Sequence, residues 1–176
     1  MSRVTAAEIA GAIRNVPDFP KPGIQFKDIT PVLADGRLFD GAIDLLVANH
    51  RDDAVTKVVG IDARGFIFGA AAALKLGAGF IPIRKKGKLP FTTHEQSYEL
   101  EYGSATVAIH TDAIHSGERV LLIDDLLATG GTAAAAVQLL ERLGAKIVGL
   151  GFLIELGFLD GRRRLRNHRV DALIRY

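Results

Sequence analysis

Apolar runs alternate with segments of helical periodicity over most of the chain, and this alternation predicts an α/β protein with a parallel sheet. The runs that end just before Asp62 and Asp124 are apolar at nearly every position, which is typical of central strands covered on both faces. Gly144 follows a helical segment and is expected to cap it. We expect strands over 57–61, 78–83, 104–110, 119–123 and 146–154, and helices over 65–76 and 132–143.

The N-terminal part of the chain follows a different pattern. Thr5-Ala6-Ala7-Glu8 is a capping-box sequence, which predicts a helix from about Thr5 to Asn15. Prolines exclude a regular helix between Pro17 and Pro31, and an irregular segment of this length in a compact domain is usually functional or disordered. After it, one helical face is expected to be buried, formed by Phe39, Ala42, Ile43 and Leu46.

Two polar segments interrupt the pattern. Residues 92–101 have no apolar period, so we expect a mobile loop there. The basic run Arg162–Arg166 is expected to form a solvated helix face and not a nucleic-acid patch.

Length and composition describe an ordinary globular chain. With 176 residues it is expected to form one domain, and its net charge of +2 gives little reason to expect a nucleic-acid partner. The chain has no cysteine, and its start lacks the basic and apolar regions of a secretion signal. The most apolar window, Gly65 to Ile83, contains Lys75 and Pro82 and is expected to be a buried helix and strand. We therefore expect a cytoplasmic protein without a membrane partner.

The segment from Val120 to Thr132 carries the clearest chemical pattern. It begins as a buried strand, continues with two adjacent acids, Asp124 and Asp125, and ends in a loop of small residues that opens a helix. Open α/β sheets bind ligands at the carboxyl ends of their strands, and N–H groups at a helix N-terminus bind phosphate. A ribose 5-phosphate would fit here, with its hydroxyls on the acids and its phosphate on Ala128, Thr129, Gly130, Gly131 and Thr132.

A pair of acids at a strand end also occurs in a different kind of site. Two acids end the metal-binding strand of nucleotide hydrolases, but those proteins carry a Gly-x-x-x-x-Gly-Lys-Ser/Thr loop, which this sequence lacks. Adjacent charges at the end of an apolar strand are costly without partners, and this cost favours a binding role for the acids. Arg64, Lys85 and Lys88 follow two other expected strands, where they are either solvated or bind anions.

The Val120–Thr132 segment resembles the signature of the type I phosphoribosyltransferases, which bind 5-phosphoribosyl 1-diphosphate. Further segments are similar to the members of that family that use adenine, and they occur in the family's order, at residues 17–33, 60–66, 83–90 and 98–103. The resemblance implies a type I phosphoribosyltransferase-like parallel sheet flanked by helices, with a mobile loop. It also implies one domain over residues 1–176, of which residues 1–35 form a small base-binding hood.

The resemblance implies how the phosphoribosyl substrate is bound. Asp124 and Asp125 would hold the ribose 2- and 3-hydroxyls, with a Mg²⁺ ion nearby that the substrate itself mainly holds. The diphosphate would be bound by Arg64, Lys85 and Lys88, since basic side chains suit a leaving group with several negative charges.

Roles at the purine base rest on the resemblance alone. Glu101 would act on the purine ring as acid or base, and Tyr102 would help to close the site. Phe26 would stack on adenine, while Gln25 and Lys27 would offer main-chain groups to the edge of the base. Many relatives have arginine in place of Lys27, which should matter little if recognition uses the main chain.

The implied activity is purine salvage by a Mg²⁺-dependent homodimer that joins adenine to 5-phosphoribosyl 1-diphosphate and releases AMP and diphosphate. One alternative is a phosphoribosyltransferase for a 6-oxopurine such as hypoxanthine or guanine. The other is a regulator that binds 5-phosphoribosyl 1-diphosphate without catalysis. Such regulators usually add a DNA-binding domain, whereas the blocks that resemble the enzyme already account for the residues before the signature.

Overall fold

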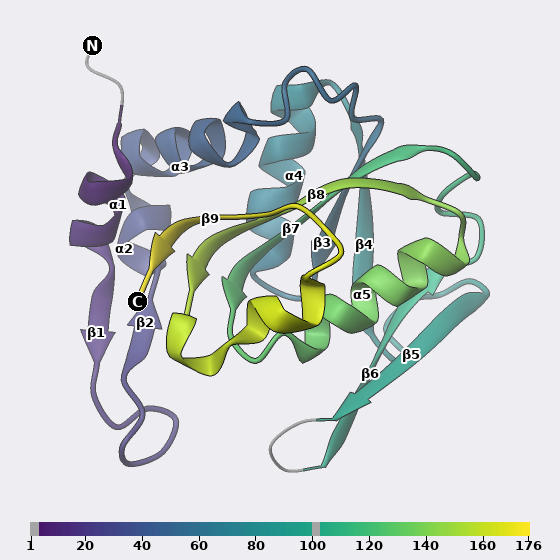
Figure 1. Cartoon of the computed structure of the whole chain (residues 1–176). Coiled ribbons are helices and arrows are strands. Elements are labelled where there is room, and N and C mark those ends of the chain that lie inside the picture. Colours follow the sequence, from purple (N-terminus) through teal and green to yellow (C-terminus); the bar gives the residue numbers. More distant parts are fainter. Residues whose placement is uncertain (1–3, 100–102) are drawn as a thin grey trace. The chain divides into compact units, whose positions relative to one another are not determined.

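The computed structural model describes residues 4–99 and 103–176, and it divides into two compact units, residues 1–45 and residues 46–176 (Figure 1). No helix in these described ranges is both long and apolar enough to cross a membrane. The assignment of the whole chain to one domain, with residues 1–35 as a base-binding hood, stays a prediction.

The first unit begins with helix α1 (Ala6–Ala12), which has the predicted capping box. The Thr5 hydroxyl accepts a hydrogen bond from the Glu8 amide at 3.2 Å, and the Glu8 carboxylate accepts one from the Thr5 amide at 2.9 Å. The predicted helix end at Asn15 is wrong. Strand β1 (Arg14–Val16) pairs with strand β2 (Phe26–Asp28), and this antiparallel pairing takes the backbone of Asn15 out of the helix.

Two further helices follow the proline-rich segment. α2 (Thr30–Ala34) has Pro31 in its first turn, where a missing N–H costs nothing, and α3 (Gly36–Ala48) continues past the end of the first unit. Burial of the predicted face of α3 is confirmed for Ala42, Ile43 and Leu46. The fourth residue of that face, Phe39, is only half-buried.

The second unit contains a seven-stranded sheet with the order β5-β6-β4-β3-β7-β8-β9. Five neighbouring strands of the sheet are parallel, namely β4, β3, β7, β8 and β9. At the edge beside β4, β5 and β6 form an antiparallel hairpin. The predicted parallel sheet flanked by helices is therefore confirmed. The strands are β3 (Lys57–Ile61), β4 (Gly79–Lys85), β5 (Thr93–Glu99), β6 (Ser104–His110), β7 (Arg119–Leu127), β8 (Lys146–Glu155) and β9 (Val170–Arg175).

Two helices cover the two faces of this sheet. α4 (Gly65–Leu76) packs on β3, β4 and β7, whereas α5 (Gly131–Arg142) packs on β5, β6 and β8 (Figure 1). β3 and β7 are central strands and are buried almost throughout, as their apolar sequences predict. After β8, two short 3₁₀ turns, η1 (Gly157–Leu159) and η2 (Gly161–Leu165), lead to β9.

The prediction of a loop over residues 92–101 is wrong for 93–99, which form β5. Every residue of β5 pairs with β6, from Thr93 opposite His110 to Glu99 opposite Ser104. Its side chains are half-buried or exposed, so no apolar alternation marked it as a strand. The hydrogen bonds of the hairpin stabilise the strand instead, and these depend on a partner segment that local patterning does not reveal.

β3 and β7 flank a topological switch point. From β3 the chain passes through α4 to β4 on one side, and from β7 it passes through α5 to β8 on the other side. The two connections leave a crevice at the carboxyl ends of β3 and β7, which is where open α/β sheets bind ligands.

Candidate active site

A pocket of about 380 Å³ lies at this switch point. It brings together the loop after β3, the end of β7 and the loop that opens α5. Its lining consists of Ile61, Asp62, Ala63, Arg64, Lys85, Tyr98, Asp124, Asp125, Leu126, Leu127, Ala128, Thr129, Gly130, Gly131, Thr132 and Ala133.

Asp124 and Asp125 lie beside the loop that follows β3. The parallel register of β3 and β7 places Gly60 opposite Ile123, so the residues that follow these two lie near each other at the same edge of the sheet. Asp125 is buried, with 7% of its surface exposed. Its carboxylate accepts a hydrogen bond from the Arg64 guanidinium and forms an ion pair with it. Asp124 turns back on the chain, and its Oδ1 accepts from the Asp125 amide at 2.9 Å.

The start of α4 has no room for a side chain beside these acids. A Cβ on Gly65 would lie 2.6 Å from Oδ1 of Asp124. The missing side chain therefore lets the carboxylate approach the first turn of the helix, where the helix dipole favours negative charge. Gly65 thus belongs to the site although it does not line the pocket.

Burial raises the pKa of Asp124 well above its usual range, and the negative charge of Asp125 raises it further. The hydrogen bond from the Asp125 amide and the charge of Arg64 oppose this rise without cancelling it. The acids therefore repel each other in the ligand-free protein. A ligand that donates hydroxyl protons, or a cation, would relieve that repulsion.

Because its pKa is raised on folding, ionised Asp124 destabilises the folded protein. This destabilisation is fully present above the folded pKa and disappears as the pH falls through it toward the unfolded value near 3.8. Asp124→Asn should therefore increase the free energy of unfolding at neutral pH. Urea titrations of both proteins over a pH series should show the difference shrinking toward acid. A constant difference at every pH would contradict the raised pKa.

The loop of small residues also lines the pocket. Gly130 caps α5 with a left-handed backbone, φ +79°, which favours glycine, and the helix begins at Gly131. The first amides of this helix and the exposed Thr129 therefore border the pocket. A helix N-terminus with hydroxyl groups beside it suits a phosphate.

The other predicted phosphate-binding residues are only partly brought together. Arg64 and Lys85 line the pocket, and the Asp62–Ala63 peptide bond between β3 and Arg64 is cis. Lys88 is not among the lining residues of the described chain, and its carbonyl oxygen accepts from Arg84 at 3.0 Å. Arg84 also lies 3.4 Å from Asp62, so it orders the loop that follows β3.

The predicted base-side residues belong to other parts of the chain. Gln25 immediately precedes β2, and Phe26 and Lys27 are part of it, so all three belong to the first unit. Within that unit the rings of Phe26 and Phe19 pack edge to face at 5.1 Å, and the Lys27 ammonium donates to Asn15 at 2.6 Å. Glu101 and Tyr102 lie outside the described residues.

Sequence reasoning missed one pocket residue that carries a distinctive side chain. Tyr98 lines the pocket from β5 and packs against the apolar core, and its ring approaches Gly131 so closely that a Cβ there would lie 3.2 Å away. An aromatic residue within an otherwise polar segment was the available signal, but it has meaning only once residues 93–99 are known to be a strand.

Comparison with known proteins agrees with this geometry. Residues 30–172 match the family model of the phosphoribosyl transferase domain. An adenine phosphoribosyltransferase from Acidothermus cellulolyticus is 57% identical over 167 residues, which cover 95% of this chain and 94% of that protein. The chain belongs to the adenine phosphoribosyltransferase family.

Solved structures of adenine phosphoribosyltransferases have the same fold. The Rhodothermus marinus enzyme is 52% identical with a TM-score of 0.93, over 97% of this chain and 98% of that one. The Saccharomyces cerevisiae enzyme, solved with adenine and an imino-altritol bisphosphate, is 42% identical with a TM-score of 0.91, over 96% of this chain and 97% of that one. The expected family membership is therefore confirmed across nearly the whole chain.

Proposed function

We propose that this chain is an enzyme of purine salvage, which transfers the 5-phosphoribosyl group from 5-phosphoribosyl 1-diphosphate to adenine and produces AMP and diphosphate. The observation that carries this proposal is the pocket at the switch point, which two adjacent acids and the N-terminus of a helix line together. The close adenine phosphoribosyltransferase relatives support adenine as the base.

The phosphoribosyl substrate binds across this pocket. Its 5-phosphate accepts hydrogen bonds from main-chain amides of residues 128–132 and from the threonine hydroxyls there. Its ribose hydroxyls donate to Asp124 and Asp125, whose mutual repulsion makes them good acceptors. Its diphosphate lies toward Arg64, Lys85 and Lys88.

The reaction separates charge along one bond. As the bond from the anomeric carbon to the diphosphate oxygen breaks, positive charge builds on the sugar and negative charge builds on the leaving group. A nitrogen of adenine then forms the new bond to that carbon. The acids on the ribose side and the basic side chains on the diphosphate side stabilise these opposite charges, so catalysis consists mainly of positioning and electrostatics.

Recognition of the base is assigned to residues 25–27. Phe26 stacks on adenine, and Gln25 and Lys27 present main-chain groups to its edge. The Lys27 ammonium donates to Asn15 at 2.6 Å, which supports a main-chain role for this residue at the base. If recognition uses the main chain, lysine in place of arginine should matter little. Glu101 serves as acid or base at the purine ring, and Tyr102 helps to enclose the diphosphate; both roles rest on family resemblance.

Mg²⁺ is proposed as the cofactor. Among residues 4–99 and 103–176, no three metal-binding side chains lie close enough together to hold an ion. Mg²⁺ commonly keeps several waters and binds through one or two carboxylates together with substrate phosphates. The two acids in this pocket suit that mode of coordination. Asp124 and Asp125 would therefore face the ion, which neutralises the diphosphate when it is bound.

A homodimer is proposed as the working form. Leu74 and Ile67 lie two turns apart on one face of α4, where 85% and 40% of their surfaces are exposed. Apolar side chains on a shared helix face favour burial against another copy. The cytoplasmic location stays a prediction.

An assay with three radiolabelled bases tests the proposed activity. The protein with Mg²⁺ and 5-phosphoribosyl 1-diphosphate should convert adenine to AMP much faster than it converts hypoxanthine or guanine. Faster conversion of either 6-oxopurine would support the 6-oxopurine alternative. Binding of the phosphoribosyl substrate without conversion of any base would support the regulator.

We further propose that the β5–β6 hairpin, in place of a loop, closes over bound substrate. β5 is an edge strand without a buried side chain, and its Tyr98 borders the pocket. A glutamate-specific protease should cut the hairpin more slowly when 5-phosphoribosyl 1-diphosphate with Mg²⁺ is bound, because ligands favour the closed form. Cleavage after Glu141 on α5 is the internal control, and equal hairpin cleavage with and without ligand would contradict closure.

A further inference from the structure

The loop of residues 128–131 touches a segment that follows β8, main chain against main chain. A Cβ on Gly161 would lie 2.1 Å from the Ala128 carbonyl oxygen and 2.8 Å from the Gly130 amide nitrogen. In the other direction, a Cβ on Gly130 would lie 2.4 Å from the Gly161 carbonyl oxygen. All the contacted atoms belong to the backbone, so no side-chain rotation could relieve a clash.

Gly161 is required by this contact and not by its own backbone conformation. Gly130 has a left-handed backbone with φ at +79°, whereas the φ of Gly161 is not positive. Alanine at residue 161 is therefore compatible with the local backbone, and only the loop opposes it. A change at this residue tests the contact without adding conformational strain.

Arg162 anchors the segment next to that contact. Its Nε and Nη2 donate to the two carboxylate oxygens of Glu155 at 3.1 Å and 2.5 Å, and its Nη1 donates to the Val170 carbonyl oxygen at 2.6 Å. Glu155 ends β8 and is only 2% exposed. This two-pronged geometry is specific to arginine, because lysine offers a single point charge.

Arg162 pairs with the carboxylate of Glu155, which is buried. The hydrogen bonds from Arg162 lower the pKa of Glu155 and outweigh the effect of burial, which raises it. Glu155 is therefore ionised at neutral pH, and its guanidinium partner is needed to offset its burial. At the far end of η2, Leu165 is buried in the core, so the segment is fixed on both sides of the contact.

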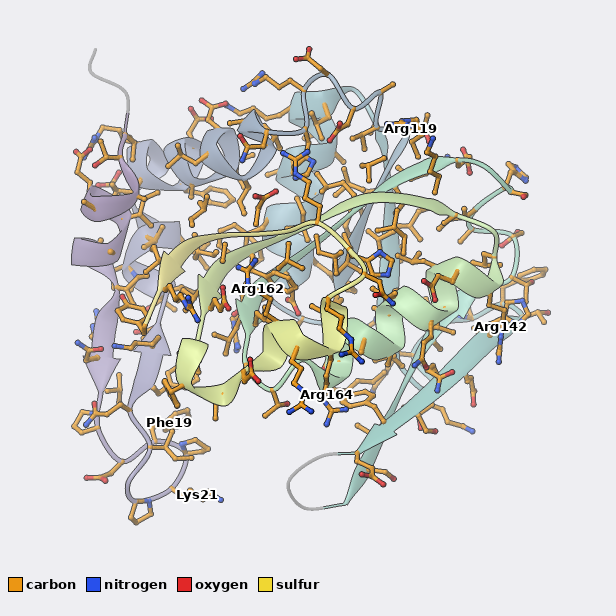
Figure 2. All side chains as sticks on the ribbon, viewed as in Figure 1. Phe19, Lys21, Arg119, Arg142, Arg162 and Arg164 are labelled. Atoms are coloured by element: carbon orange, nitrogen blue, oxygen red, sulfur yellow. The ribbon has the colours of Figure 1, made fainter. Side chains whose placement is uncertain are left out.

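The other arginines of the run differ from Arg162. Figure 2 labels Arg162, which points toward the strand ends, and Arg164, which points away from the sheet. Arg163, Arg164 and Arg166 are exposed. The prediction of a solvated face is therefore confirmed for these three arginines and is wrong for Arg162. Arg162 pairs with the buried Glu155, which lies seven residues earlier, and no helical pattern in the sequence connects the two residues.

We propose that Gly161 and Arg162 are positioning residues for the phosphate-binding loop: Gly161 sets the place of the Ala128–Gly130 main chain, and Arg162 holds Gly161 there through Glu155. This proposal rests on the proposed function, in which that loop binds the 5-phosphate. Main-chain amides bind phosphate only if they converge on it, and displacement by about 1 Å can cost on the order of a hundredfold in activity.

The proposal is tested with Gly161→Ala and Arg162→Lys, and Arg163→Lys is the matched control. The dissociation constant for ribose 5-phosphate is measured by calorimetry below the unfolding temperature of each variant. Steady-state kinetics supply the KM values for 5-phosphoribosyl 1-diphosphate and for adenine. Arg162→Lys keeps the charge opposite Glu155, so it provides a readout if Gly161→Ala does not fold.

Both test variants should weaken ribose 5-phosphate binding by about tenfold to a hundredfold, as expected for the loss of one hydrogen bond to a charged group. The KM for adenine should stay within about twofold of wild type, and the control should match wild type in every measurement. A purely structural role predicts lower unfolding temperatures with unchanged ribose 5-phosphate affinity, and that result would overturn the proposal.

The outcomes also separate this proposal from the activity itself. Wild-type protein that binds ribose 5-phosphate but leaves adenine unconverted would contradict the proposed function, while the variants' affinities would still decide the positioning roles. Wild-type protein that does not bind ribose 5-phosphate would overturn both, because the loop would then not be a phosphate site.

Discussion

Replacing Asp124 and Asp125 together with asparagine should lower kcat/KM by roughly 10²- to 10⁴-fold. Each ribose hydroxyl would exchange its hydrogen bond to a charged carboxylate for a weaker one to a neutral amide oxygen. Hydrogen bonds to charged groups contribute about 1.5–3 kcal/mol each, or about one to two factors of ten, which sets the upper end of the loss at each residue. The loss should be larger in kcat than in substrate affinity, because the negative charge matters most when positive charge develops on the sugar.

The fold should survive this double replacement. The two acids repel each other, and burial raises the pKa of Asp124, so amides of the same shape remove an unfavourable interaction. Arg64 loses its ion pair with Asp125 but remains partly exposed to water. Circular dichroism should therefore be unchanged while activity falls. Asp112→Asn, at an exposed acid outside the pocket, is the control, and near-wild-type activity of the double variant would remove both acids from the site.

Glu101→Gln should lower kcat by about 10²- to 10⁴-fold, the usual contribution of a general acid or base. Glutamine keeps the shape and polarity of the side chain but cannot exchange a proton with the purine ring. Binding of 5-phosphoribosyl 1-diphosphate should change by less than about threefold, because the proposed role concerns the base and not the sugar phosphate.

Glu95→Gln is the matched control for this variant. Glu95 lies earlier in the same segment, on β5, and forms an ion pair of 2.7 Å with the exposed Lys86. Exposed ion pairs contribute little, so this change should leave kcat intact. A loss of less than about threefold in Glu101→Gln would show that the family role of this glutamate does not transfer to this chain.

The central strands and the loop of small residues before α5 were predictable because local sequence determines them. Continuous apolar runs produced β3 and β7, and Thr5 with Glu8 formed the predicted helix cap. The two acids were predicted from the apolar run before them. The predicted strand end at Ile123 is wrong, because β7 continues through both acids to Leu127 and pairs with β8 there. Glu101 and Tyr102 were identified only by family resemblance, and their roles stay predictions.

Residues 93–99 could not be assigned correctly from sequence, because their strand depends on pairing with Ser104–His110 and not on an apolar face. For the same reason Tyr98 escaped notice as a pocket residue. Backbone hydrogen bonds between strands are open to almost any sequence, so a polar strand leaves little trace in composition.

The sequence by itself determined the order of most strands and helices, the acids before a loop of small residues, and the family to which the chain is similar. Only the tertiary structure decided that Gly65 makes room for Asp124, that burial raises the pKa of Asp124, that Gly161 touches the loop of residues 128–131, and that Arg162 pairs with Glu155. These relations join segments far apart along the chain. Their strength depends on distances and burial that exist only after the sheet has brought those segments together.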